Sequence, residues 1–266
     1  FSFTNIIKLL WVILTLGYLL LSGCGDGGKP LPEQGFDLKG ISLSAEMSLP
    51  VQRALKRAGE PPGDELPASL VMAQYNHLSH AINGLDSSAA VDSLITLWSA
   101  EPENLVWIDL ALRSNRILKN NTHYQDLLAS PALTDTASAV GCFRMGYENY
   151  RRQSGGRWLQ KCLRLEHELN PLQKIWLNKW LAIVEKDDLR PDDGVRRLLA
   201  QLEDSWKIGG PRLEFELWTS ITNGLLAGDH LDDALHTAAL AGTIARQVGD
   251  PYLLTRAEFW MGLVMT

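Results

Sequence analysis

The sequence predicts an all-α fold that is built from stacked pairs of antiparallel helices. The first observation is a spacing, because Pro131, Pro171, Pro211 and Pro251 recur every 40 residues. Proline has no N–H to donate and a preset φ, so it is tolerated in the first turn of a helix and is costly further in. The four prolines therefore indicate four equivalent helix starts. Period-two runs of β-branched residues are absent, so we expect almost no sheet.

The second observation is an apolar register behind these prolines. Sites 40 residues apart are occupied by Ala137, Leu177, Leu217 and Ala257, and the next sites, four residues on, by Leu181, Ile221 and Met261. Steps of four place these side chains on one face of a helix. Gln173 and Gly141 depart from the register. A single helix pair cannot bury its apolar face, so neighbouring pairs must stack. An irregular helical bundle is the alternative, but it gives no reason for the equal spacing.

The third observation is the turns between helices. Gly228-Asp229 and Gly249-Asp250 separate predicted helices over 211–226, 231–248 and from 251 onward. Two more second helices are predicted over 156–169 and 192–208. Capping residues and apolar patterning before this region predict further helices over 50–58, 65–82, 87–99, 103–118, 123–128 and 134–151. The tryptophans lie mostly on these helices, which favours a role in the core over a ligand cage.

The first residues read as a secretory signal peptide over residues 1–23. Lys8 is followed by an apolar run over residues 9–21 and then by small residues. Leu21-Ser22-Gly23-Cys24 closely resembles the bacterial lipobox. That resemblance implies that the Cys24 thiol receives diacylglycerol, with fatty acids such as palmitate, and becomes the new N-terminus. A transmembrane anchor is the alternative, but the apolar run is shorter than the roughly 20 residues that a bilayer requires.

The remaining chain divides into a tether and a helical domain. Residues 24–47 are rich in Gly and Pro and read as a lipidated cysteine followed by a flexible linker, and residues 48–266 as the helical repeats. Gly25 follows Cys24 where an Asp would retain a lipoprotein in the inner membrane. We therefore expect an outer-membrane anchor with the domain facing the periplasm. Because residues 259–266 are apolar and lack a polar capping helix, we also expect the natural protein to continue.

The C-terminal hairpins resemble the tetratricopeptide repeat, in particular its variety of about 40 residues. The similarity is carried by the two Gly-Asp turns and by Ala234, Leu235, Ala238, Ala241, Met261 and Gly262. Trp107-Ile108-Asp109-Leu110-Ala111 is similar to the Trp-x-x-Leu-Gly opening of that family. The resemblance implies a right-handed α-solenoid with a concave groove that holds a peptide or a partner protein, and an interaction role in envelope assembly or signalling.

Composition and missing motifs narrow the function further. The net charge is −6 and no basic cluster exceeds Arg151-Arg152 or Arg196-Arg197, which argues against a nucleic-acid partner. No nucleophile elbow, Walker loop or dinucleotide fingerprint is present, so we expect neither a cofactor nor catalysis. The alternative is that the chain is the recruiting arm of a larger envelope enzyme, either a CHAT-type protease or a peptidoglycan-cleaving enzyme. Glu166 and Glu214 do not stand out from other surface acids as catalytic candidates.

Two groups of side chains are candidates for a site. Cys142 and Cys162 would lie on facing helices of one hairpin, offset by about four residues or ~6 Å. Because a disulfide needs Cα atoms within about 7 Å, a disulfide and two buried thiols both stay open. The second group is the acids and histidines of residues 229–236, which have the spacing of metal ligands. Acids in a first helical turn also cap N–H groups and favour the helix dipole, so no metal is predicted. The acidic loop over 187–193 reads as solvated.

Overall fold

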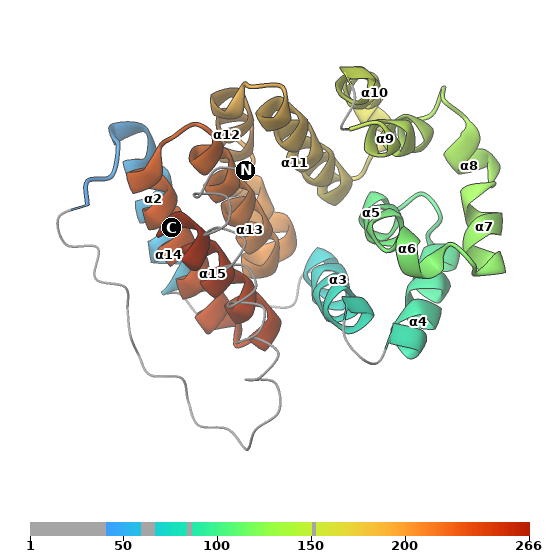
Figure 1. Ribbon diagram of the computed structural model, residues 1–266, viewed down its shortest axis with the longest axis horizontal. Helices are drawn as coiled ribbons and strands as arrows, with labels where there is room; N and C mark the ends of the chain where they lie inside the picture. Colours follow the sequence, from blue (N-terminus) through green and yellow to red (C-terminus); the bar gives the residue numbers. More distant parts are fainter. Residues whose placement is uncertain (1–40, 60–66, 84–86, 151–152) are drawn as a thin grey trace, which may run out of the picture. The chain divides into compact units, whose positions relative to one another are not determined.

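The computed structural model describes residues 41–59, 67–83, 87–150 and 153–266 (Figure 1). The predicted signal peptide, the predicted lipobox residues Leu21, Ser22 and Gly23, Cys24 and most of the predicted linker lie outside these residues. Within the described ranges the fold is all-α and no residue is in a strand. The helices are α2 (Ala45–Ala58), α3 (Pro67–Asn83), α4 (Ser87–Ala100), α5 (Leu105–Arg113), α6 (Asn115–Leu118), α7 (Thr122–Leu128), α8 (Pro131–Thr134), α9 (Ala139–Glu148), α10 (Gln153–Arg164), the 3₁₀ turn η1 (Glu166–Glu168), α11 (Pro171–Asp187), α12 (Pro191–Leu199), α13 (Leu202–Ala227), α14 (Leu231–Val248) and α15 (Pro251–Val264).

The four spaced prolines all begin helical segments. Pro131, Pro171 and Pro251 occupy the first turns of α8, α11 and α15. Pro211 lies inside α13, but Gly210 directly before it has φ 62° and ψ −156°, so the helix is interrupted there and Pro211 starts its second part. Only glycine adopts this conformation easily. The helical starts at these prolines were therefore predicted correctly.

The turns that follow α11 and α13 have the same backbone conformation. Leu189 (φ 61°) and Asp229 (φ 60°) are the non-glycine residues with positive φ in the described chain, and they lie 40 positions apart. Gly249 after α14 has φ 69° and ends that helix in the usual left-handed conformation. Leucine is poorly suited to this region of φ, and the Leu189 side chain is 90% exposed.

Several predicted helix boundaries were wrong, because capping residues and turns end the helices at points where the apolar periodicity continues. The helix predicted over 134–151 starts only at Ala139, as α9, since Thr134 ends α8, Asp135 is extended, and Ser138 caps α9 by accepting a hydrogen bond from the N–H of Gly141. The helix predicted over 103–118 breaks at Ser114. The one predicted over 192–208 ends at Leu199, and α13 then starts at Leu202.

The boundary between linker and domain also needs correction. Helix α2 begins at Ala45, with Ser44 as its N-cap, rather than at Pro50, which lies inside the helix. Met47, which was assigned to the flexible linker, is buried. Residues 45–47 therefore belong to the folded domain. Pro50 indicated that a helix begins nearby, but the helix begins five residues before it.

The core contains most of the described tryptophans, as predicted. Trp98, Trp107, Trp176 and Trp218 are fully buried, and Trp180 is nearly so. Gln173, which breaks the apolar register, is also buried and has a capping role. Its side chain accepts a hydrogen bond from the N–H of Asn170 at 2.9 Å and donates one to the carbonyl oxygen of Glu103 at 2.8 Å. Polar capping at the start of α11 thus replaces an apolar contact.

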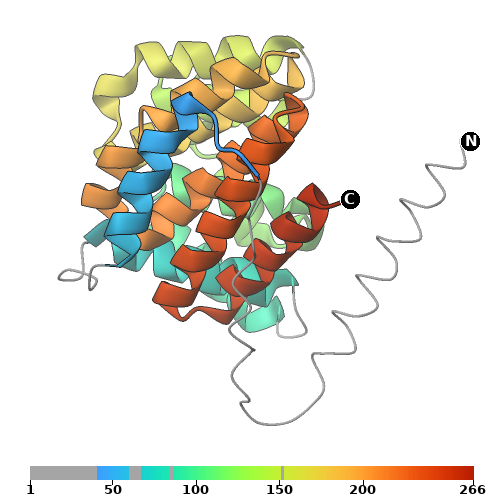
Figure 2. The same ribbon diagram turned by 90° about the vertical axis from the view of Figure 1, so that its left-hand side faces the viewer.

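The N-terminal helices pack against the C-terminal ones within the compact unit Leu38–Thr266. From α11 onward each helix packs against its neighbours in the chain, but α2 also lies along α14, and α3 packs against α13 and α15 (Figures 1 and 2). The N–H of Ser44 donates to Asp233 at 2.8 Å and fixes the start of α2 on α14. Apolar periodicity does not predict these long-range contacts. They bring α3, α5, α11, α13 and α15 together around a polar centre.

Candidate functional site

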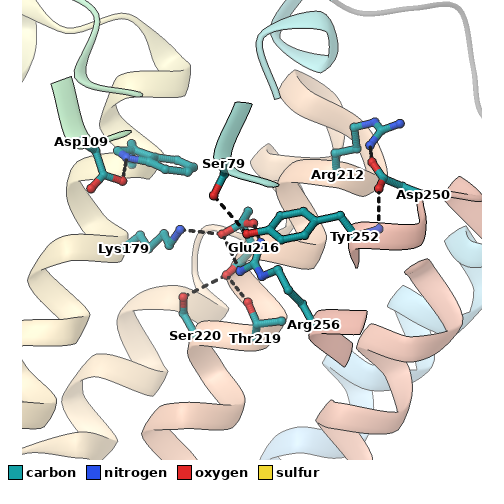
Figure 3. Close-up of polar contacts among 11 residues, drawn as sticks. Ser79, Asp109, Lys179, Arg212, Glu216, Thr219, Ser220, Asp250, Tyr252 and Arg256 are labelled. Carbon is teal, nitrogen blue, oxygen red and sulfur yellow. Dashed lines mark hydrogen bonds and ion pairs between the residues drawn. The ribbon is translucent and has the colours of Figure 1, made fainter. Parts of the chain in front are cut away.

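A group of buried polar contacts lies where these five helices meet, and Glu216 is at its centre (Figure 3). The Glu216 carboxylate accepts a hydrogen bond from Nζ of Lys179 at 2.7 Å and from Nη2 of Arg256 at 3.2 Å. Arg256 donates a second, shorter bond through Nη1. The side chains of Glu216 and Lys179 are 1% and 4% exposed, so α11, α13 and α15 are joined by an ion cluster inside the protein.

The ionisation of this cluster is set by burial and by mutual charge. Burial alone would raise the pKa of Glu216, but Arg256 and Lys179 outweigh it and hold that pKa well below its usual range. Burial lowers the pKa of Lys179, and the Glu216 carboxylate offsets only part of that effect. The Lys179 ammonium also lies 4.0 Å from the centre of the Trp176 ring, a cation–π distance.

A second buried carboxylate, Asp109 of α5, extends the cluster toward α11. One oxygen accepts from Nε of Arg113 at 2.8 Å, and the other accepts from the indole Nε1 of Trp176 at 3.0 Å. Tyr75 of α3 packs edge-on against Trp176, with the ring centres 5.0 Å apart. Burial raises the pKa of the Tyr75 phenol, which keeps this ring neutral over the physiological range.

The outer contacts of the cluster connect α3, α13 and α15. The hydroxyls of Ser79 and Tyr252 are 3.0 Å apart, and Arg212 pairs with Asp250, whose other oxygen accepts the N–H of Tyr252 at 3.0 Å. Figure 3 shows Tyr252 reaching toward Ser79 beside Glu216. The same helices are therefore held both at the cluster and at the start of α15.

Glu214, predicted to be an ordinary surface acid, is buried. Its side chain has no exposed area and pairs with Arg57 of α2, which also lies 5.7 Å from the centre of the Trp206 ring. The indole Nε1 of Trp218 donates to the same carboxylate at 3.2 Å. Burial raises the pKa of Glu214 and outweighs the Arg57 charge. The pair attaches the first described helix to α13.

This arrangement restricts what the cluster can do chemically. A general base must present a free oxygen toward a substrate within hydrogen-bond reach. Both oxygens of Glu216 and both oxygens of Asp109 are already bonded to a lysine, an arginine or an indole of the chain. The geometry thus suits a clamp between helices better than a proton-transfer site.

An open cleft of about 390 Å³ lies elsewhere, between α3 and α4. Gln74, His77 and Ala81 line it on α3, and Ala89, Ser93 and Leu97 line it on α4. The small alanine and serine side chains leave the space between the two helices. The cleft combines apolar walls with a few polar groups, which is the usual character of a site for a ligand or a peptide side chain.

Cys142 and Cys162 are both buried free thiols in the structure. The Cys142 thiol donates to the carbonyl oxygen of Thr136 at 3.2 Å. Burial raises the pKa of Cys162 to about 12. The disulfide that the sequence left open is therefore absent from this structure, and the thiols serve as small apolar side chains in the α9–α10 hairpin.

The acids and histidines of residues 229–236 are directed to separate partners. Asp233 bonds to the N–H of Ser44, His236 lies 3.1 Å from the carbonyl oxygen of Ile41, and His230 lies 3.0 Å from Asp192. Among the described residues, no group of three or more His, Cys, Asp or Glu side chains is arranged to hold a metal ion. The region instead attaches the start of the domain and the first turn of α12 to α14.

The other acidic candidates also have local partners. Glu168 accepts the N–H of Ala139 at 2.8 Å and so caps α9 from a distance, while Asp193 pairs with Arg196 at 2.6 Å. Asp187 pairs with Lys186 at 3.0 Å. Acids of the loop over 187–193 are therefore paired with basic residues that lie close to them in the sequence.

Sequence reasoning missed the residues of the central cluster, although a signal for them exists. Trp176, Glu216 and Arg256 are spaced by 40 residues, one position before the apolar register of Leu177, Leu217 and Ala257. Glu216 and Arg256 pair at the centre of the cluster (Figure 3), and Trp176 donates to its second carboxylate, Asp109. Opposite charges at equivalent positions of the first helices of two successive hairpins, here α13 and α15, are a sign of pairing between those helices.

Comparison of the chain with protein-family models, with curated proteins and with solved structures found no match. Over the described ranges, no helix has both the length and the apolar character needed to cross a membrane. The function is therefore inferred from the fold and from the contacts within the chain.

Proposed function

We propose that this protein is a lipid-anchored, non-catalytic interaction protein of the bacterial envelope. Cys24 carries the lipid, the linker spans the distance to the domain, and the helical hairpins form a right-handed α-solenoid of the tetratricopeptide type. The 40-residue recurrence of helix starts, of the turns at Leu189 and Asp229, and of Trp176, Glu216 and Arg256 supports the solenoid. The anchor is an outer-membrane one, with the domain in the periplasm.

The main support for a binding role is the open cleft between α3 and α4. It has about 390 Å³ of open space, whereas the buried carboxylates Glu216 and Asp109 are engaged by cations of the chain itself. A peptide segment of a partner protein can place one or two apolar side chains against Ala81, Ala89 and Leu97, with polar contacts to His77. One wall of the cleft is fixed from behind, because Tyr75 and Ser79 of α3 contact Trp176 and Tyr252, and this gives the partner a preorganised surface.

Photocrosslinking from both sides of the cleft tests this role. A benzophenone amino acid is placed at Gln74 on α3 and at Ser93 on α4 of the membrane-anchored protein in intact cells, and adducts are identified by mass spectrometry. Thr96 is the matched control, because it is exposed on α4 but does not line the cleft. We expect the same partner at Gln74 and Ser93 and none at Thr96. Different adducts at the two cleft positions, or equal adducts at Thr96, would contradict a binding role for the cleft.

A further inference from the structure

The central ion cluster has more positive than negative charge. In the described chain, its contacts join three cations and two carboxylates, namely Lys179, Arg256, Arg113, Glu216 and Asp109. Trp176 links the two carboxylates, because its indole donates to Asp109 and its ring lies 4.0 Å from the Lys179 ammonium that binds Glu216. Charges inside a protein are normally balanced by opposite charges. One further negative charge would balance this cluster.

Arg113 is the cation of the cluster that has unused donors. Its Nε donates to Asp109 at 2.8 Å, but neither of its Nη groups has a hydrogen-bond partner among the described residues. Both Nη groups of Arg256, in contrast, donate to Glu216. The Arg113 side chain is also the most exposed of the three cations, at 38%. Two parallel N–H donors of a guanidinium match the two oxygens of a carboxylate.

Aromatic rings lie beside this guanidinium. Arg113 lies 5.4 Å from the centre of the Trp180 ring, and Tyr147 packs edge-on against the same ring with the centres 4.7 Å apart. The Tyr150 ring is 5.7 Å from Trp180, and both tyrosines are half-buried. A ligand that reaches Arg113 therefore has apolar ring surface next to the charge.

Two of these rings carry further unused donors. The indole Nε1 of Trp180 is buried and has no hydrogen-bond partner among the described residues, and an unpaired buried donor is costly. The Tyr147 hydroxyl also has no partner in that part of the chain. Burial raises the pKa of Tyr147, so its hydroxyl keeps the proton and can donate it to an acceptor. The unused groups at this place thus suit a ligand that supplies acceptors.

We propose that Arg113, Tyr147 and Trp180 form a binding site for a monocarboxylate that carries an aromatic or apolar group. One negative charge balances the cluster, the two oxygens match the free end of the guanidinium, and the apolar part packs against the rings of Trp180 and Tyr147. A phosphate group has a charge of about −1.5 to −2 at neutral pH and would exceed that balance.

This inference goes beyond the proposed function. The site shares no residue with the α3–α4 cleft and does not depend on the lipid anchor. It names a ligand by its chemistry, and two sources could supply that chemistry, namely a free aromatic acid or the C-terminal carboxylate of a peptide that ends in an aromatic residue. Binding to small model compounds distinguishes these two sources.

Isothermal titration calorimetry of the full chain in a non-ionic detergent tests the site, with benzoate as the probe and detergent alone as the blank. Benzamide has the same ring without the charge, and phenylphosphonate has the same ring with a larger charge. We expect benzoate to saturate one site below about 10 mM, and the other two compounds to bind about tenfold more weakly or less. Tighter binding of N-acetylphenylalanine than of benzoate would assign the peptide end as the source, and weaker binding the free acid.

Conservative substitutions locate the bound carboxylate. Arg113→Lys keeps a positive charge beside Asp109 but loses the paired donors, so it should weaken benzoate binding about fivefold or more. Tyr147→Phe keeps the ring but loses the hydroxyl, and it should weaken binding about threefold. Arg116→Lys on α6, at an exposed position, is the matched control and should bind benzoate as the original chain does.

Three results would overturn the proposal. The first is the absence of saturable benzoate binding, the second is equal binding of benzoate and benzamide, and the third is an unchanged affinity in Arg113→Lys or Tyr147→Phe. Circular dichroism checks that each variant is folded. If Arg113→Lys does not fold, Tyr147→Phe and the comparison of benzoate with benzamide still decide the outcome.

Discussion

Glu216 and Arg256 lie 40 residues apart at equivalent positions of adjacent helices, and they form a buried ion pair. Lys179 binds the same carboxylate from the other side, so one glutamate joins three helices. A buried ion cluster is not strong proof of stability, since desolvation offsets much of the attraction, but removing one partner is costly. The cluster therefore makes the packing of α11, α13 and α15 sensitive to a single side chain.

Replacement of Glu216 by glutamine should destabilise the domain by about 3–5 kcal/mol, because the buried Lys179 and the partly buried Arg256 lose their counter-charge. Urea unfolding followed by circular dichroism measures this loss. The matched control is Glu203→Gln on the same helix. Glu203 pairs with Lys207 on the exposed surface, so this substitution should leave the unfolding midpoint unchanged. Equal effects of the two substitutions would show that the central cluster does not hold the helices together.

Tyr124 should make the domain less stable in alkali. Burial raises its pKa to about 12, against about 10 in an unfolded chain. Between pH 10 and 12 the unfolded state loses the phenol proton while the folded state keeps it, so the unfolding free energy falls as pH rises. The contribution is about 2–3 kcal/mol across that window. Unfolding midpoints at pH 9, 10 and 11 should fall less steeply in Tyr124→Phe, and parallel slopes would contradict this explanation.

Leu189→Gly should stabilise the protein by about 1 kcal/mol, because the leucine occupies the left-handed region of φ and buries almost nothing. Leu55→Gly is the contrasting change, since Leu55 is also exposed but lies within helix α2. There glycine should cost about 1 kcal/mol. Thermal midpoints that fall for both variants would mean that the turn does not strain Leu189.

Cys142 and Cys162 should resist thiol reagents in the folded protein and react once it unfolds. Both thiols are buried, and the pKa of Cys162 is raised to about 12, which leaves almost no thiolate at neutral pH. Mass spectrometry after alkylation, with and without urea, counts the modified cysteines in a Cys24→Ser chain. Two alkyl groups added only in urea support buried free thiols. A chain that takes up none in urea until it is reduced would contain the disulfide instead.

The all-α class and most helix positions could be predicted because proline positions, capping residues and apolar periodicity are local signals. Helix α14 (Leu231–Val248) has the bounds that its two Gly-Asp turns predicted. The breaks at Ser114 and Asp135 could not be foreseen from periodicity, which continues across both of them. At these points the backbone conformation of one or two residues decides the structure, and apolar patterning carries no information about it.

The central cluster was harder to predict because it depends on which helices pack together. The sequence shows Glu214 and Glu216 as two acids in one apolar helix, but it does not show that Arg57 of α2 covers the first and Arg256 of α15 the second. Contacts between α2 and α13 join residues more than 150 positions apart. The acids and histidines of residues 229–236 show the converse case. Their spacing suits a shared ligand, whereas Asp233, His230 and His236 contact Ser44, Asp192 of α12 and Ile41 separately.

The most direct test of the account is the chemical state of Cys24 in protein that is expressed with residues 1–23 in place in a Gram-negative host. Mass spectrometry of the N-terminal peptide from the membrane fraction identifies the modification of Cys24, and the Cys24→Ala variant is the comparison. We expect a chain that begins at Cys24, with a diacylglycerol thioether and an acylated amine, and we expect Cys24→Ala to leave the signal peptide uncleaved. A membrane-bound chain that retains Leu21, Ser22 and Gly23 next to an unmodified Cys24 thiol would contradict the lipid-anchored role.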